Sequence, residues 1–139
     1  MNFLPISVII LTYNESKNIY DCLESVKELT DDIILIDSGS VDDTLTIASA
    51  YSTTIYHHPF ENYSKQRNWA FQNVETKFQW ILNMDADHRL TKELVTELRD
   101  LFASGIPDDV NGFMASRRTM FMGKWIRHGG HYPVYHGIL

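Results

Sequence analysis

The sequence has little of three features that would point to particular classes of protein. It has one cysteine, Cys22, which excludes an internal disulfide and whose place in a predicted apolar helix stripe favours a buried thiol. The apolar run near the N-terminus, Val8–Leu11, is far too short for a signal peptide or a membrane span. Basic residues are also few, with 12 Lys and Arg against 18 Asp and Glu, which argues against a general nucleic-acid binder. We therefore expect a cytoplasmic protein without a nucleic-acid partner.

Acidic residues are missing from the last part of the chain. Every Asp and Glu lies at or before Asp109, whereas the segment from Val110 onward carries only basic charges: Arg117, Arg118, Lys124 and Arg127. These side chains suit a diphosphate or another anionic ligand, and they suit a plain solvated face equally well. A function that needs a carboxylate cannot take it from this tail.

Strand and helix patterns alternate four times in the rest of the chain. Apolar and β-branched runs predict strands at 6–11, 33–36, 53–56 and 80–84. Apolar spacing and capping signals predict helices at 19–29, 64–73 and 91–102, and a further helix that begins with a capping box at Ser40–Asp43. The alternation predicts a parallel sheet covered by helices. Beyond residue 109 the pattern changes, with one more strand expected at 112–116.

Two carboxylates close the fourth predicted strand. Asp85 and Asp87 follow the apolar run Trp80–Met84, and because side chains alternate across a strand, both project to one side while Ala86 faces away. Neighbouring acids repel unless a cation joins them to an anionic ligand. Mg²⁺ and Mn²⁺ prefer carboxylate oxygens and keep positions free for phosphate. The pair therefore predicts a metal and phosphate site, with a cap for the helix near Thr91 as the alternative.

Polar clusters also follow the first two predicted strands, at 12–15 and 37–40. Because the carboxyl ends of parallel strands meet at one edge of a sheet, these clusters and the two acids should converge on one cleft. Tyr13 can stack on a base, and its neighbours can hydrogen-bond a base or a sugar: Thr12, Asn14 and Glu15. The alternative is a solvated turn in which Asn14 or Ser16 caps the next helix. The glycine patterns of dinucleotide-binding folds and P-loops are absent.

Taken in order, these segments resemble glycosyltransferase family 2. The resemblance rests on four motifs: Thr12-Tyr13-Asn14-Glu15, Asp37-Ser38-Gly39-Ser40-Val41-Asp42-Asp43-Thr44, Arg67-Asn68 and Asp85-Ala86-Asp87. The tail from Arg117 to Pro133 is also similar to bacterial members that extend lipopolysaccharide-core or capsule sugars. The resemblance implies the GT-A fold, a parallel α/β/α sandwich with a mixed edge, here incomplete at the C-terminus. Residues 1–109 would form the nucleotide-sugar region and residues 110–139 the start of an acceptor-side region.

The resemblance also implies a role for each motif. The segment 12–15 would hold the base and ribose, Asp37 would contact the base, and Arg67 would approach the base or the diphosphate. Asp85, followed by Ala86, would bind the ribose or a metal-bound water, and Asp85 and Asp87 are the candidate metal ligands. Asp87 would hold a Mn²⁺ or Mg²⁺ ion that bridges the two phosphates. Such an ion stabilises the charge that grows on a departing nucleoside diphosphate.

The function implied by the resemblance is that of an inverting, metal-dependent glycosyltransferase of the cell envelope. It would move a sugar from a nucleotide-diphosphate donor, a UDP-sugar being the first choice, to a glycan or lipid-linked acceptor, as in lipopolysaccharide biosynthesis. Such an acceptor implies peripheral association with the inner face of the membrane. Core surface left uncovered by a missing C-terminal part would favour a homo-oligomer.

Two departures from the family pattern concern the chemistry. His88 stands where the family commonly has Glu, and a neutral imidazole there could join the metal shell or face solvent. Inverting transfer needs a general base, and with no acid after Asp109 we expect that base to be absent from the chain. The remaining candidate is His131, one of three tail histidines with His128 and His136.

Two other functions stay open at this point. A truncated, non-catalytic module would bind nucleotide without turning it over. A sugar-phosphate nucleotidyltransferase would share the layered architecture and the metal and phosphate site. That class normally has a Gly-rich, basic loop after the first strand, and the segment 12–15 is neither.

Overall fold

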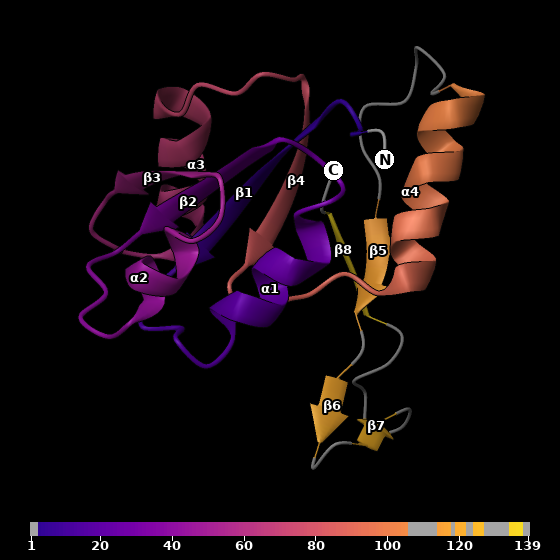
Figure 1. Ribbon diagram of the computed structural model, residues 1–139. Coiled ribbons are helices and arrows are strands. Elements are labelled where there is room, and N and C mark those ends of the chain that lie inside the picture. Colours follow the sequence, from indigo (N-terminus) through magenta and orange to yellow (C-terminus); the bar gives the residue numbers. More distant parts are fainter. Residues whose placement is uncertain (1–2, 106–113, 118, 122–123, 127–133, 138–139) are drawn as a thin grey trace. The chain divides into compact units, whose positions relative to one another are not determined.

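The computed structural model describes residues 3–105, 114–117, 119–121, 124–126 and 134–137, with side chains described up to residue 105 (Figure 1). The chain divides into two compact units, Met1–Ile106 and Pro107–Leu139. In the second unit β5 (Met114–Arg117) pairs antiparallel with β8 (Val134–Gly137), and β6 (Thr119–Phe121) pairs antiparallel with β7 (Lys124–Ile126). The strand predicted at 112–116 is thus present from Met114, and its first residues lie outside the described part.

The first unit is a parallel sheet with helices on both faces (Figure 1). Its strands are β1 (Ile6–Thr12), β2 (Asp32–Asp37), β3 (Thr53–His57) and β4 (Trp80–Asp85), in the order β3-β2-β1-β4. The helices are α1 (Ile19–Val26), α2 (Thr44–Ala48), α3 (Tyr63–Asn73) and α4 (Lys92–Ser104). The predicted alternation is confirmed. The strand order changes direction between β1 and β4, which is where sheets of this kind open a ligand crevice.

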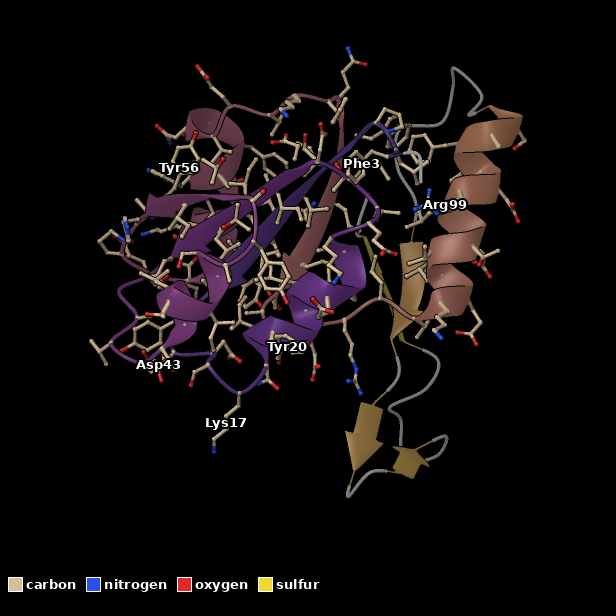
Figure 2. All side chains as sticks on the ribbon, in the orientation of Figure 1. Phe3, Lys17, Tyr20, Asp43, Tyr56 and Arg99 are labelled. Carbon is tan, nitrogen blue, oxygen red and sulfur yellow. The ribbon has the colours of Figure 1, made fainter. Side chains whose placement is uncertain are left out.

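The core lies on both faces of β1, whose seven residues are all buried. On one face, Ile9 and Ile34 pack with Ala70 of α3, and Tyr56 of β3 meets Trp69 of α3 edge to face with ring centroids 6.2 Å apart (Figure 2). The apolar stripe of α1 is buried over the opposite face, together with α2 (Figure 1). Each fully buried large aliphatic side chain contributes about 1.5–3 kcal/mol. Burial on both faces therefore anchors β1 in the middle of the unit, and its carboxyl end supports the loop that follows.

The second helix departs from the prediction, because the capping box expected at 40–43 is wrong. The helix begins only at Thr44, and its N-cap residue, Asp43, makes no side-chain capping bond. Ser40 is committed elsewhere: its hydroxyl donates to Asp37 Oδ1 at 2.5 Å and accepts the N–H of Asn14 at 2.8 Å. Because the hydroxyl of Ser40 is used between the two loops, it does not cap the helix, and the helix begins three residues later than predicted.

The fourth helix shows that the two acids after β4 are not its caps. Thr91 is the N-cap, and its Oγ1 accepts the N–H of Leu94 at 3.1 Å. The helix is tied to the sheet side of the unit by an edge-to-face contact between Trp80 and Phe102, and by Arg99, which donates to the carbonyl of Glu28 (Figure 2). The alternative that Asp85 and Asp87 serve as a helix cap is therefore excluded.

Two further expectations concern the edge of the sheet and the membrane. The described strands of the first unit are all parallel, so the expected mixed edge does not occur among them; antiparallel pairing is found in the second unit. Within the described residues no helix has both the length and the apolar character needed to cross a membrane.

Candidate nucleotide and metal site

A cleft of about 610 Å³ opens at the carboxyl ends of β1 and β4. Its walls come from four separate segments: Leu11, Thr12, Tyr13 and Glu15 at the end of β1 and in the loop after it; Ser38 after β2; Pro59, Phe60 and Tyr63 around the start of α3; and Asp85, Ala86 and Asp87 at the end of β4 and in the turn after it. The predicted convergence of three polar clusters on one cleft is present in the structure. Asn14, Asp37 and Arg67, also predicted as site residues, are not among the lining residues.

The lining residues give the cleft an aromatic and acidic character. Tyr13, Phe60 and Tyr63 each expose about half of their surface, so part of each ring is free to meet a ligand. Glu15, Asp85 and Asp87 are acidic, and none of the described residues that line the cleft is basic. Aromatic faces suit a base or a sugar ring. The carboxylates repel a phosphate unless a cation lies between them.

The loop after β1 is fastened to the loop after β2 by reciprocal hydrogen bonds. Asn14 has a left-handed backbone (φ 50°), and its side-chain Oδ1 accepts the N–H of Val41 at 2.8 Å. Two further main-chain N–H groups of this loop donate across: Glu15 N–H to Thr44 Oγ1 at 2.9 Å and Ser16 N–H to Asp42 Oδ2 at 3.2 Å. The alternative in which Asn14 or Ser16 caps α1 is therefore wrong. The connection holds Tyr13 and Glu15 at the rim.

Hydrogen bonds from its own loop and from the loop after β1 keep the carboxylate of Asp42 ionised. The hydroxyl and N–H of Thr44 and the N–H of Ser16 donate to this carboxylate. They lower the pKa of Asp42 to about 2. The loop connection is therefore anionic at neutral pH and is made by charge-assisted hydrogen bonds.

Asp37 shapes its own turn. Its carboxylate is 1% exposed, and Oδ2 accepts the N–H groups of Gly39 at 3.0 Å and Ser40 at 2.9 Å. Gly39 has φ 107°, a conformation that only glycine adopts readily, as its place in the turn suggests. In this arrangement the carboxylate of Asp37 contacts its own loop and His57, whose Nδ1 lies 3.7 Å away. The predicted contact of Asp37 with a base stays a prediction.

Arg67 projects from α3 to the end of β4. Its guanidinium donates to the side chain of Asn83 at 3.2 Å, to the carbonyl of Met84 at 3.1 Å and to Asp85 Oδ1 at 3.4 Å. Burial lowers the pKa of Arg67, but its ordinary pKa is so high that the charge remains. Arg67 therefore holds the carboxylate of Asp85 through Oδ1. Its predicted contact with a base or diphosphate stays a prediction. Lys65, by contrast, is an exposed partner of Glu61.

The two acids lie on a tight turn that His88 closes. The N–H of His88 donates to the carbonyl of Asp85 at 2.9 Å, and the N–H of Asp85 donates to His88 Nδ1 at 3.1 Å. Since Nδ1 accepts, the neutral ring carries its proton on Nε2, which lies 3.7 Å from Asp85 Oδ2 and 3.8 Å from Asp87 Oδ1. In this orientation His88 is a donor that faces both carboxylates.

Oxygen and nitrogen atoms of Asp85, Asp87 and His88 lie within 4.8 Å of one another, a spacing that fits one divalent cation. In the tautomer described above neither ring nitrogen of His88 offers a free lone pair, so the two carboxylates are the available ligands. Asp87 is the open member, with its side chain 60% exposed, whereas Asp85 is 23% exposed and has protein donors on both oxygens. Carboxylate oxygens are the ligands that Mg²⁺ and Mn²⁺ prefer. The residues present therefore fit the predicted cation, and Asp87 is the carboxylate most open to it.

Thr12 adds a polar group without a partner. Its Oγ1 is buried, and within the described residues it has no hydrogen-bond partner, although Thr12 lines the cleft. A buried hydroxyl left unpaired costs about 1–3 kcal/mol. This is the feature expected of a site whose partner arrives with a ligand.

The segment after β3 contributes two aromatic residues to the cleft that were not identified from the sequence. Phe60 and Tyr63 line the cleft, yet only Pro59 and the helix after it drew attention in the sequence. The clue available was position: two aromatic residues follow the third strand at the same edge as the other clusters. His131 and His128 lie outside the described residues, and so do the side chains of His136 and the tail arginines.

Comparisons with known proteins agree with this geometry. Residues 7–136 match the model of the family described as Glycosyl transferase family 2. The uncharacterized glycosyltransferase RC0292 of Rickettsia conorii is 39% identical over 99 residues, which are 71% of this chain and 34% of that protein. The lipopolysaccharide core biosynthesis glycosyltransferase LpsC of Rhizobium meliloti is 30% identical over 125 residues, covering 86% of this chain and 44% of that protein.

The fold is similar to that of S. aureus TarS, with a TM-score of 0.56 at 24% identity over 73% of this chain and 33% of TarS. The expected α/β fold of the GT-A type, with its parallel sheet, is confirmed. The chain spans about a third of the length of the first curated relatives that it matches. On the match over residues 7–136 and these likenesses, the chain belongs to glycosyltransferase family 2.

Proposed function

We propose that the cleft binds the nucleoside diphosphate of a sugar donor through a divalent cation held at Asp87. The observation that carries the proposal is the composition of the cleft: among the described residues that line it are three acids, three half-exposed aromatic side chains and no basic residue. A diphosphate meets only repulsion from such walls, and one divalent ion reverses the sign of that interaction. Membership of glycosyltransferase family 2 supports the same function.

The chain's own residues divide the binding work. Tyr13 offers a ring face to the base, and the unpaired hydroxyl of Thr12 and the carboxylate of Glu15 offer hydrogen bonds to base or ribose. Asp87 holds the cation, which when bound neutralises charge on the departing diphosphate. Asp85 is fixed by its neighbours and faces the cation or the ribose.

The donor and acceptor are the finer part of the proposal. We propose a UDP-sugar donor and Mn²⁺ or Mg²⁺ as the cation. For the acceptor we propose an envelope glycan or a lipid-linked sugar at the inner face of the membrane, with inversion at the transferred carbon. The likeness to LpsC supports a role in lipopolysaccharide biosynthesis. No described residue is assigned as the general base, and His131 stays the candidate from the sequence.

The test is a thermal-shift and calorimetric screen of UDP, GDP and UDP-glucose, each with Mn²⁺, with Mg²⁺ and with a chelator. A ligand at a hundred times its Kd stabilises the native state by about 2.7 kcal/mol. We expect a shift only when nucleotide and cation are both present. Asp87→Asn should abolish it, and the matched control Asp100→Asn, which changes an exposed acid on α4, should not. Equal binding with the chelator would refute the role of the cation, and no binding at all would refute the site.

Turnover separates the alternatives. Cation-dependent binding without release of sugar from UDP-glucose, even with acceptor present, would select the non-catalytic module. Release of pyrophosphate from nucleoside triphosphate and sugar phosphate would select the nucleotidyltransferase.

A further inference from the structure

Tyr63 is a cleft residue that no sequence motif accounts for. It is the first residue of α3, it lines the cleft, and its ring meets Phe60 edge to face with centroids 6.2 Å apart. Its hydroxyl also donates a hydrogen bond to Asp85 Oδ2. Tyr63 therefore contacts both an aromatic residue of the cleft, Phe60, and an acidic one, Asp85.

Tyr63 and Arg67 act on the same carboxylate from the same helix face. They are four residues apart on α3, a spacing that places side chains one above the other. Tyr63 takes Oδ2 of Asp85, and Arg67 takes Oδ1 at 3.4 Å. With one donor on each oxygen, the carboxylate of Asp85 is held in one rotational position.

The neighbouring acid has no such support. Asp87 is 60% exposed, and within the described residues the polar side-chain atom that faces it is Nε2 of His88, 3.8 Å from Asp87 Oδ1. A freely rotating Asp85 would present either oxygen toward Asp87 and would compete for the cation or the ribose in several geometries. Burial and the nearby carboxylate raise the pKa of Tyr63, so its hydroxyl keeps its proton and remains a donor.

We propose that Tyr63 is a positioning residue that, together with Arg67, locks Asp85 in the one orientation that leaves Asp87 as the direct cation ligand. The inference rests on the proposed function of the cleft. It predicts two separable contributions from one side chain: the hydroxyl acts through Asp85 on cation-dependent binding, and the ring acts on the nucleotide by contact.

The experiment compares Tyr63→Phe with Tyr63→Leu and with Tyr20→Phe, which removes the hydroxyl of an exposed tyrosine on α1. Calorimetry measures UDP affinity with Mn²⁺ and, separately, Mn²⁺ affinity at saturating UDP. Tyr63→Phe removes a hydrogen bond to a charged group and should weaken Mn²⁺ binding about tenfold or more. Tyr63→Leu should weaken UDP binding further, and Tyr20→Phe should match the parent.

A double-mutant cycle with Asp85→Asn tests whether Tyr63 acts through Asp85. In the Asp85→Asn background, Tyr63→Phe should have little further effect on Mn²⁺ affinity. The same cycle measured as the free energy of unfolding needs no ligand, and the two substitutions should be non-additive there as well. Additive effects in either measurement, or unchanged Mn²⁺ affinity in Tyr63→Phe, would overturn the inference while leaving the site intact. A parent chain that fails to bind UDP with Mn²⁺ would instead refute the proposed function itself.

Discussion

Substitutions of Asn14 test whether this residue shapes the loop that borders the cleft or contacts the ligand directly. The resemblance implies that Asn14 binds nucleotide, but the structure uses its side chain to accept the N–H of Val41 and its left-handed backbone to turn the loop. Three variants test the two features. Asn14→Asp keeps the acceptor and the tolerance for positive φ, Asn14→Gly keeps only the tolerance, and Asn14→Ala keeps neither.

The structure sets the size of each effect. Losing the partly exposed hydrogen bond to Val41 costs about 1 kcal/mol, and forcing Ala to a φ of 50° costs about 1 kcal/mol more. Asn14→Ala should therefore lose about 2 kcal/mol, Asn14→Gly about 1 kcal/mol, and Asn14→Asp little. For a domain of this size, 2 kcal/mol corresponds to a fall in Tm of about 8 °C.

Thermal unfolding and UDP calorimetry with Mn²⁺ give the two measurements. We expect affinity to follow stability across the series, because a loosened loop no longer holds Tyr13 and Glu15 at the rim. If Asn14 touched the nucleotide through its amide, Asn14→Asp would lose affinity as severely as Asn14→Ala while remaining as stable as the parent. That result, or equal stability of the Ala and Gly variants, would refute the reasoning.

Three further predictions concern the surrounding carboxylates and the arginine. The pKa of Asp42 is lowered from 3.8 to about 2, so its contribution to stability is complete above about pH 4 and is lost as the pH falls toward 2. Asp42→Asn should therefore flatten this part of a plot of Tm against pH. A plot unchanged from that of the parent would contradict the prediction. Asp32, buried at the opposite edge of the sheet, accepts the hydroxyl of Ser7 at 2.6 Å and the N–H of Lys77 at 2.9 Å. Asp32→Ala should cost about 1–3 kcal/mol in chemical denaturation without changing UDP affinity, and a loss of affinity at unchanged stability would count against it. Arg67→Lys keeps the charge, but one ammonium group cannot donate to all three acceptors of the guanidinium. It should therefore weaken cation-dependent UDP binding severalfold in calorimetry. Binding equal to that of the parent would mean that Asp85 does not need the hydrogen bond from Arg67.

The sheet and its edge were predictable because they follow from chain-wide patterns. The apolar runs that became β1 and β2 can be satisfied only by burial on both faces, and parallel order then places Thr12, Asp37 and Asp85 at one edge. The same argument predicted that helices cover the sheet, since an apolar stripe such as that of α1 needs an apolar surface to bury against. Neither step needs any knowledge of loop geometry.

The hydrogen bonds that shape the cleft were not predictable in this way. Ser40 reads as a helix cap in the sequence, yet its hydroxyl is taken by Asp37 and by Asn14, which lies 26 residues earlier. Tyr63 and Arg67 carry ordinary helix spacing, and nothing in that spacing says that both reach Asp85. Such pairings depend on where two loops meet in space, and several partners of similar chemistry compete for each donor.

The central claim is that Asp87 holds a cation against a diphosphate in this cleft. A crystal of the chain grown with UDP and Mn²⁺, measured at the manganese absorption edge, tests it most directly. The account predicts one anomalous peak beside the carboxylate of Asp87, in contact with the diphosphate, and loss of both in Asp87→Asn. A nucleotide seated in the cleft with no metal at Asp87, or a metal bound elsewhere, would contradict it.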